Sequence, residues 1–280
     1  MDKRFDRSVR FFGAEGQDRI GGKSLAVIGI GGLGTHVVQQ AVLLGFCMFW
    51  LIDPEVLDVT NLNRYVGVYP SDVGTPKVEL GARIIRSVNP SATVVQVRDR
   101  LQSRAAFDAI RQSDVVIGCL DTDGARLVCA EVSAAAGKPY VDMASDILSE
   151  DLLRFGGRMV FSFLGTGCIV CRGLLDLEAA RVELNPAATA AHEAIYGVPH
   201  AALRVDVGPA VVSINGVVAS LGVTELMLEI TGIRRGAAVL TYRGELGKVL
   251  VSADLPRADC YYCAGIFGRW EDAGVEKYLM

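Results

Sequence analysis

The stretch LAVIGIGGLGTHVVQQAVLLGFCMFWLID, from Leu25 to Asp53, has the pattern of a strand, a glycine turn, a helix and a second strand, followed by an acidic residue. The run SLAVIG predicts a strand buried on both faces, as in a parallel sheet. Glycines in such a turn let the backbone approach a phosphate, while the helix N-terminus offers N–H groups to the anion. Three glycines of the turn, Gly29, Gly31 and Gly34, have the spacing G-x-G-x-x-G, and Gly32 is an additional glycine. A nucleotide-binding βαβ unit is therefore predicted.

Asp53 ends the second strand of this unit, CMFWLID, 19 residues after Gly34. An acidic residue at this place can accept hydrogen bonds from ribose hydroxyls. The motif leaves two nucleotides open, NAD and ATP. A tight strand–helix turn without a ligand is the third interpretation.

The first 145 residues alternate between predicted strands and helices. Strands are expected at 24–29, 47–53, 92–97, 114–119 and 139–143, and helices at 35–44, 76–88, 104–111 and 123–136. Thr75 is the expected N-cap of the second helix, with Pro76 as its first residue. This alternation predicts an α/β fold, a doubly wound, Rossmann-like, mostly parallel sheet with right-handed crossovers.

The second half has a different pattern, which predicts antiparallel strands added to the same sheet. An antiparallel-type strand is expected at 157–163, a buried helix at 211–230, and a hairpin from 237–244 and 247–255. Residues 176–207 are Ala-rich and predict a partly helical crossover segment. We expect a single domain over 1–280, with an N-terminal arm at 1–23, a nucleotide-binding half at 24–150 and an extension at 151–280.

Composition narrows the class of protein. The formal charge of −4 gives no reason to expect a nucleic-acid partner. The first ten residues are charged, which argues against a secretory signal, and the longest apolar run, 41–52, is too short to cross a bilayer. We therefore expect a cytoplasmic protein with no membrane partner, in which paired cysteines favour metal over disulfides.

Two CxxC pairs, CIVC and CYYC, stand 88 residues apart. Four thiolates in two such pairs form a closed tetrahedral structural Zn²⁺ site. Two redox dithiols, or ordinary core cysteines, are the alternatives. The predicted ligands are Cys168, Cys171, Cys260 and Cys263.

The segment after Asp53 has no role in a dehydrogenase. Together with the earlier motifs it resembles the ubiquitin-activating-enzyme superfamily, specifically its bacterial ThiF/MoeB/HesA-type members. The matching elements, in family order, are GIGGLG at 29–34, Asp53, NLNR at 61–64, GTPK at 74–77, CLD at 119–121 and the two CxxC pairs. The resemblance covers nearly the whole chain.

The resemblance implies an ATP-dependent adenylyltransferase. Such enzymes use ATP and Mg²⁺ to convert the C-terminal glycine carboxylate of a ubiquitin-like or sulfur-carrier protein into an acyl-adenylate, with release of pyrophosphate. A conjugating or sulfur-donor protein then takes the activated carboxylate. Two anions must meet in this reaction, so positioning and charge neutralisation dominate the catalysis.

Residue roles follow from the same match. Arg64 and Lys77 correspond to residues that hold the triphosphate, Asn61 to one close to the phosphates, and Asp121 to the acid that positions Mg²⁺. The family's structural zinc falls on the four paired cysteines. The alternatives are that Arg64 and Lys77 are solvated surface cations and that Asp121 is a helix N-cap.

The N-terminal stretch RFDRSVRFFGAEGQDRI resembles the family's R-Y-x-R-Q segment. By that match Arg7 is an arginine finger, on an arm that can reach the nucleotide of a partner protomer in a homodimer. Phe5 replaces the family Tyr, and Ser8 replaces the Gln. An ordinary basic arm is the alternative.

Family members that form a thioester with their substrate carry a cysteine in the crossover segment. This chain has no cysteine between Cys171 and Cys260, and Cys47, Cys119 and Cys129 read as small core residues. We therefore expect adenylation without a crossover thioester.

Three other functions remain to be weighed. An NAD-dependent oxidoreductase needs only Gly29 to Asp53, and it leaves Arg64, Lys77 and the CxxC pairs unexplained. An inactive family member would tend to lose the phosphate-binding cations. Adenylation of a tRNA base or of a small peptide would keep the chemistry and change the acceptor.

Overall fold

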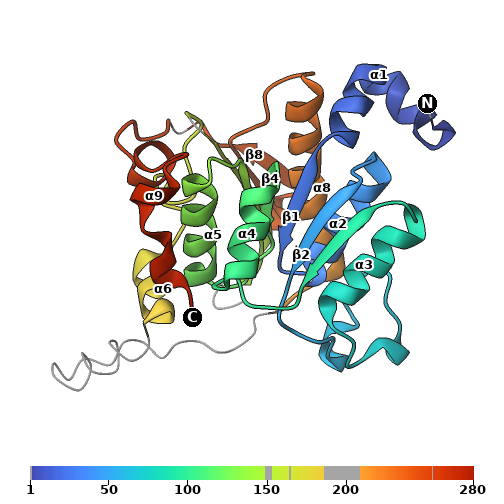
Figure 1. Ribbon diagram of the computed structural model, residues 1–280, viewed down its shortest axis with the longest axis horizontal. Helices are drawn as coiled ribbons and strands as arrows, with labels where there is room; N and C mark the ends of the chain where they lie inside the picture. Colours follow the sequence, from blue (N-terminus) through green and yellow to red (C-terminus); the bar gives the residue numbers. More distant parts are fainter. Residues whose placement is uncertain (1, 149–152, 164, 186–208, 254) are drawn as a thin grey trace.

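One eight-stranded sheet organises the chain, in the order β3-β2-β1-β4-β5-β6-β7-β8. This computed structural model describes all residues except 1, 149–152, 164, 186–208 and 254 (Figure 1). The strands are β1 (Ser24–Ile28), β2 (Met48–Ile52), β3 (Thr93–Val97), β4 (Val115–Gly118), β5 (Tyr140–Leu148), β6 (Arg154–Ser162), β7 (Val239–Arg243) and β8 (Lys248–Val251). Strands β1 to β5 pair in parallel, and β6 to β8 add antiparallel strands. The predicted fold class is confirmed.

Helices cover both faces of the sheet (Figure 1). On one face lie α2 (Gly32–Leu44), α3 (Lys77–Val88) and α8 (Val212–Thr231), and on the other α4 (Arg104–Gln112), α5 (Asp123–Ala135), α6 (Leu177–Leu184) and α9 (Trp270–Ala273). Every residue of β1 and β4 is buried, which explains their uninterrupted apolar sequences. Short helical turns are η1 (Lys3–Phe5), η2 (Val59–Asn61), η3 (Pro70–Asp72), η4 (Gly244–Leu246), η5 (Tyr261–Gly265) and η6 (Val275–Tyr278).

Three element boundaries differ from the prediction. Helix α2 begins at Gly32, so the last glycines of the turn already form its first turn. Helix α3 begins at Lys77 with Pro76 at the N-cap, where Thr75 was expected, because Pro76 is extended and bridges to Val56. Strand β5 continues to Leu148 because β6 pairs with it along its whole length.

The N-terminal arm forms a helix, α1 (Asp6–Gly21), which is broken by a kink at Gly13 with φ of 79°. Two residues, Gly22 and Lys23, connect it to β1. Near its end, Arg19 Nη1 donates to the Thr231 carbonyl of α8 at 3.2 Å. The arm is thereby attached at the amino end of the parallel strands.

Helix α8 is the buried helix that the sequence predicts. It is long and apolar enough to cross a membrane, but the buried core helix of a soluble protein has the same length and composition. It packs against α2, β5 and β6, and 56% of its apolar window is buried. Of the predicted crossover segment, α6 is observed, and residues 186–208 lie outside the described part of the chain.

Candidate nucleotide site and four-cysteine cluster

The glycine turn lies where the strand order reverses. The chain proceeds from β1 towards β2 and from β4 towards β5, so a crevice is expected at the carboxyl ends of β1 and β4. Gly29 has a φ of 87°, and a Cβ on it would lie 2.5 Å from the Cys119 carbonyl oxygen. Only glycine allows this approach. No side chain caps the first turn of α2, whose N–H groups are therefore available to an anion.

Asp53 fastens the end of β2 to the glycine turn. Its Oδ2 accepts from the Ile30 N–H at 2.7 Å, and its Oδ1 accepts from the Glu55 N–H at 2.9 Å. Burial raises the pKa of Asp53, against the opposing effects of the Glu55 N–H, the Lys77 charge and the Ile30 N–H. A carboxylate oxygen accepts more than one hydrogen bond, so this geometry leaves room for a ribose hydroxyl.

Lys77 is the first residue of α3, and its side chain is only 9% exposed. It forms an ion pair with Glu55, and its Nζ lies 5.7 Å from the centre of the Tyr65 ring. The Tyr65 hydroxyl donates to the Ile30 carbonyl at 2.5 Å. Lys77 is therefore a buried cation beside the glycine turn, and its interpretation as a solvated surface cation is wrong.

Asn61 and Arg64 lie in the segment that follows β2, Asn61 as the last residue of η2 and Arg64 against the first residue of α2. Asn61 is 8% exposed, and its Oδ1 accepts from the Asp58 N–H at 3.2 Å in a capping box. Arg64 Nη1 donates to the Thr60 carbonyl at 2.7 Å. A Cβ built on Gly32 would lie 3.0 Å from Arg64 Cγ, so the Arg64 stem rests against the glycine turn.

Asp121 is exposed in the loop that follows β4. The cap of α5 is Thr122, whose Oγ1 accepts from the Ala125 N–H at 3.3 Å. The N-cap interpretation of Asp121 is therefore wrong. Its carboxylate makes no hydrogen bond to any residue that the structure describes, and it stands at the same edge of the sheet as the glycine turn.

A buried ion pair between Arg126 and Asp142 lies beneath this loop and was not predicted from the sequence. Arg126 Nη1 donates to the two carboxylate oxygens of Asp142 at 2.8 and 2.9 Å, and its Nη2 donates to the Leu120 carbonyl. The Tyr140 hydroxyl also donates to Asp142, at 2.9 Å. Arg126 thus positions the backbone next to Asp121. In the sequence, the only indications of this pair were an arginine in the apolar pattern of α5 and an aspartate in that of β5.

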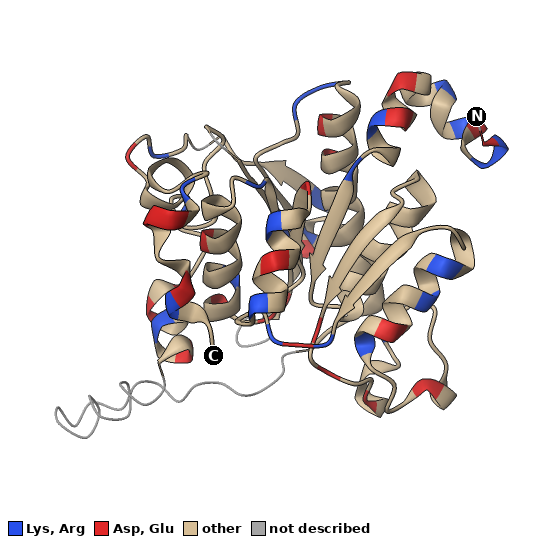
Figure 2. Cartoon of the chain, viewed as in Figure 1, with Lys and Arg blue, Asp and Glu red and all other residues tan. Residues whose placement is uncertain are grey.

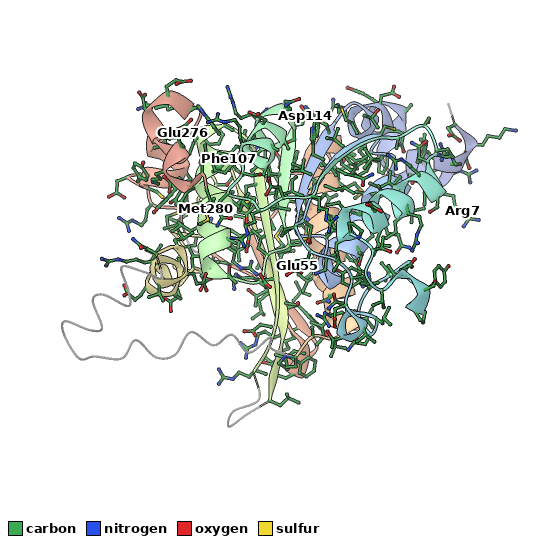
Figure 3. The ribbon with its side chains drawn as sticks, turned by 60° about the horizontal axis from the view of Figure 1, so that its bottom comes forward. Arg7, Glu55, Phe107, Asp114, Glu276 and Met280 are labelled. Atoms are coloured by element: carbon green, nitrogen blue, oxygen red, sulfur yellow. The ribbon has the colours of Figure 1, made fainter. Side chains whose placement is uncertain are left out.

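Arg7 lies apart from these residues. It is exposed on α1, and Figure 3 shows it well separated from Glu55. Because α1 joins the amino end of β1 and the glycine turn follows its carboxyl end, β1 alone separates the two by about 16 Å. Within one chain, Arg7 is not part of the assembled site.

The four paired cysteines come together, as predicted. Their Sγ atoms all lie within 4.8 Å of one another, with 3.7 Å between Cys168 and Cys260 and 3.9 Å between Cys171 and Cys263. Four sulfurs about 2.3 Å from a central Zn²⁺ would be about 3.8 Å apart. The cluster therefore fits zinc and joins the end of the chain to the segment after β6.

The remaining cysteines divide between core and surface. Cys129 is buried, and Cys119 is half-buried beside the glycine turn. Cys47 is exposed, contrary to the core position expected for it, because β2 begins one residue later.

Acidic and basic residues are interspersed along the helices (Figure 2). The nucleotide site owes its cations to the few buried or half-buried residues named above, Arg64 and Lys77 among them. The positive charge at the nucleotide site therefore comes from these few residues.

Relatives of known name share part of the chain. The SAMP-activating enzyme E1 of Haloferax volcanii is 33% identical over 129 residues, covering 46% of this chain and 48% of that protein. The sulfur carrier protein adenylyltransferase of Thermus thermophilus is 33% identical with the same coverage. Bovine adenylyltransferase and sulfurtransferase MOCS3 is 31% identical over 57% of this chain and 34% of its own length. The chain thus spans half or less of the length of these relatives.

Solved structures share the fold over a greater length. The structure of E. coli MccB with ATP has a TM-score of 0.68 and 18% identity, covering 94% of this chain and 75% of MccB. At this identity the likeness concerns the fold. Residues 5–260 match the ThiF family, and with the glycine turn, the loop that follows β2 and the four-cysteine cluster in place, the chain belongs to that family.

Proposed function

We propose that the protein is an ATP-dependent adenylyltransferase that activates the C-terminal glycine carboxylate of a ubiquitin-like or sulfur-carrier protein. A carboxylate oxygen bonds to the α-phosphorus of ATP, and the bond from that phosphorus to the bridging oxygen breaks. Pyrophosphate leaves with the electron pair, and an acyl-adenylate remains. The observation that carries the proposal is the position of Arg64 and Lys77 beside the glycine turn of a ThiF-family chain, with Asp121 two residues after Cys119, whose carbonyl lies against Gly29.

Each residue has a place in this reaction. The N–H groups of the glycine turn and of α2 hold the phosphates, and Asp53 holds the ribose. Arg64, Lys77 and Asn61 offset the negative charge that gathers when a carboxylate approaches a phosphate. Asp121 would hold Mg²⁺, which would supply positive charge against that of the leaving pyrophosphate. Because Lys77 is already buried and held by Glu55, little of its side-chain freedom is lost when a nucleotide binds.

The test is ATP–pyrophosphate exchange with Mg²⁺ and a panel of small proteins that end in Gly-Gly, with short peptides as a second panel. Exchange should depend on one carrier and disappear in Asp121→Ala. The matched control is Asp272→Ala, an exposed aspartate on α9, which should exchange like the wild type. Wild-type ATP binding without exchange on any carrier would contradict the protein substrate, and exchange with a peptide alone would move the proposal to a peptide acceptor.

The competing oxidoreductase function predicts a different ligand. Thermal stabilisation by ATP and Mg²⁺, with none by NAD, supports adenylation. Stabilisation by NAD alone would refute it.

The proposal includes direct transfer from the acyl-adenylate to a sulfur donor or to the nucleophile of a downstream conjugating protein. The absence of cysteine from residues 172–259 supports it. Accordingly, no reducible adduct between the enzyme and its carrier should accumulate during turnover on non-reducing gels. We place this chemistry in a reducing cytoplasm, in one adenylation domain over residues 1–280.

A homodimer completes the proposal, with Arg7 acting on the nucleotide of the partner protomer. The support is the position of Arg7 at the opposite end of β1 from its own glycine turn. Mixing inactive Arg7→Ala and Asp121→Ala chains should restore about a quarter of the wild-type rate, because half of the dimers would carry one intact site. No recovery in chains shown to exchange subunits would place Arg7 in its own site or outside catalysis.

A further inference from the structure

Asn215 is a buried polar residue in the first turn of α8 that no step above uses. It lies in the apolar sequence VVSINGVVAS and is 3% exposed. Its Oδ1 accepts from the Ser145 hydroxyl on β5 at 2.7 Å. This bond fixes the orientation of the carboxamide and leaves the two Nδ2 hydrogens for another partner.

The Nδ2 group is directed at the glycine turn. A Cβ built on Gly32 would lie 2.8 Å from Asn215 Nδ2 and 3.0 Å from Arg64 Cγ. Gly32 is the first residue of α2, so Nδ2 and the Arg64 stem flank the helix end that offers N–H groups to an anion. Among the described residues, the hydrogen bond that fixes the Asn215 side chain is the one to its Oδ1, and none is made by Nδ2.

A carboxamide that is held in one orientation by Ser145, and whose N–H groups bond to no described residue, is available to donate to a ligand. The groups around Gly32 are a helix N-terminus, the Arg64 side chain and the Asn215 amide donor, together with one acceptor, the Arg64 carbonyl oxygen, 3.1 Å from the same built Cβ. Helix α8 also begins here, and its N-cap residue, Val211, supplies no side-chain hydrogen bond. A phosphate oxygen is the acceptor that suits this set of donors.

We propose that Asn215 donates a hydrogen bond to a phosphate of the bound nucleotide, and that Ser145 is the positioning residue that aims it. This inference rests on the proposed function and adds a phosphate contact from the second half of the chain. It couples α8 to the nucleotide site, so the extension contributes to nucleotide binding as well as to the core.

The experiment measures the dissociation constants of ATP with Mg²⁺ and of adenosine by calorimetry, for full-length wild type, Asn215→Ala and Asn215→Asp. A hydrogen bond to a charged group accounts for roughly a 10- to 100-fold change in affinity. We expect both variants to lose ATP affinity by about this factor, with Asn215→Asp the weaker because its carboxylate faces the phosphate. Adenosine affinity should be unchanged. Ser145→Ala should give a smaller loss in the same direction.

Asn89→Ala is the matched control, because Asn89 is a buried asparagine (6% exposed) at the far end of α3. It should lower the melting temperature without changing ATP affinity. Equal losses of ATP and adenosine affinity in Asn215→Ala, or no loss of either, would overturn the inference. ATP binding needs no carrier protein. If the wild type binds ATP but shows no pyrophosphate exchange with either carriers or peptides, the adenylation proposal is overturned, and the affinities measured here still test the role of Asn215.

Discussion

Replacing Arg126 by methionine should destabilise the protein and disturb the Asp121 loop together. The pair is deeply buried, with side-chain exposures of 7% for Arg126 and 0% for Asp142. Methionine keeps much of the length of the arginine stem and removes both hydrogen bonds to the carboxylate. Asp142 would retain the Tyr140 hydroxyl at 2.9 Å and Arg158 Nη2 at 4.0 Å, which is beyond hydrogen-bond distance.

Removing one member of a buried, hydrogen-bonded ion pair costs about 3–5 kcal/mol. Because one hydrogen bond and a more distant cation remain for Asp142, we expect the lower end, about 3 kcal/mol. An unfolding entropy of about 2.1 cal/mol/K per residue gives about 0.6 kcal/mol/K for a chain of this length, so Tm should fall by about 5 °C.

Differential scanning calorimetry of Arg126→Met tests this value. Arg104→Met, an exposed arginine at the start of α4, is the control and should shift Tm by less than about 1 °C. The double variant Arg126→Met/Asp142→Leu should recover most of the loss, since no buried charge is then left unpaired. A single-variant shift below about 2 °C, or a double variant less stable than the single, would refute the reasoning.

Three further predictions concern other contacts. Arg83 donates to Asp72 at 2.6 and 2.5 Å and lowers the pKa of that carboxyl from 3.8 to about 2. The stabilisation is therefore present above pH 3.8 and lost as the pH falls towards 2. Arg83→Met should lower the free energy of unfolding by about 1 kcal/mol at pH 6, the value for a half-exposed pair. In thermal melts this difference from the wild type should become smaller between about pH 6 and pH 3, and a difference that stays constant contradicts the prediction. Cys260→Ser should abolish binding of about one zinc per chain, measured by mass spectrometry of the metal; retained zinc contradicts the four-sulfur site. Glu183 accepts from the Gly124 N–H at 2.5 Å, so Glu183→Ala should speed amide exchange in the first turn of α5; unchanged exchange would show that this bond does not protect the turn.

The fold was predictable because local patterns and architecture agree. Buried parallel strands need continuous apolar runs, and SLAVIG and VVIG supply them. The predicted ends of helices and strands were wrong where strand pairing or packing outweighs the local preference of the residues. Glycine disfavours helix, yet Gly32 and Gly34 lie inside α2, because Arg64 and Asn215 crowd against Gly32 and the Gly29 carbonyl crowds against Gly34. The later residues of β5 have no strand pattern, and the antiparallel partner β6 extends them.

The linear motifs placed Asn61, Arg64, Lys77 and Asp121 at one edge of the sheet. They could not show that Lys77 is buried against Glu55, because that contact depends on how the loop after β2 folds back. Asn215 was hidden for a similar reason. A polar residue in an apolar helix has no periodic signature, and its orientation depends on Ser145, 70 residues earlier.

The long separation of the two cysteine pairs has a consequence for biosynthesis. The first pair leaves the ribosome well before the second, since 88 residues lie between Cys171 and Cys260. At elongation rates of about 5 to 20 residues per second this interval is about 4 to 18 s. During it a metal ion at the first pair would have two sulfur ligands, a weak and exchangeable complex open to transfer by cellular thiols. Metal capture should therefore be a late event on the nascent chain, and a shortage of zinc would leave the last helices undocked on a sheet that is already made.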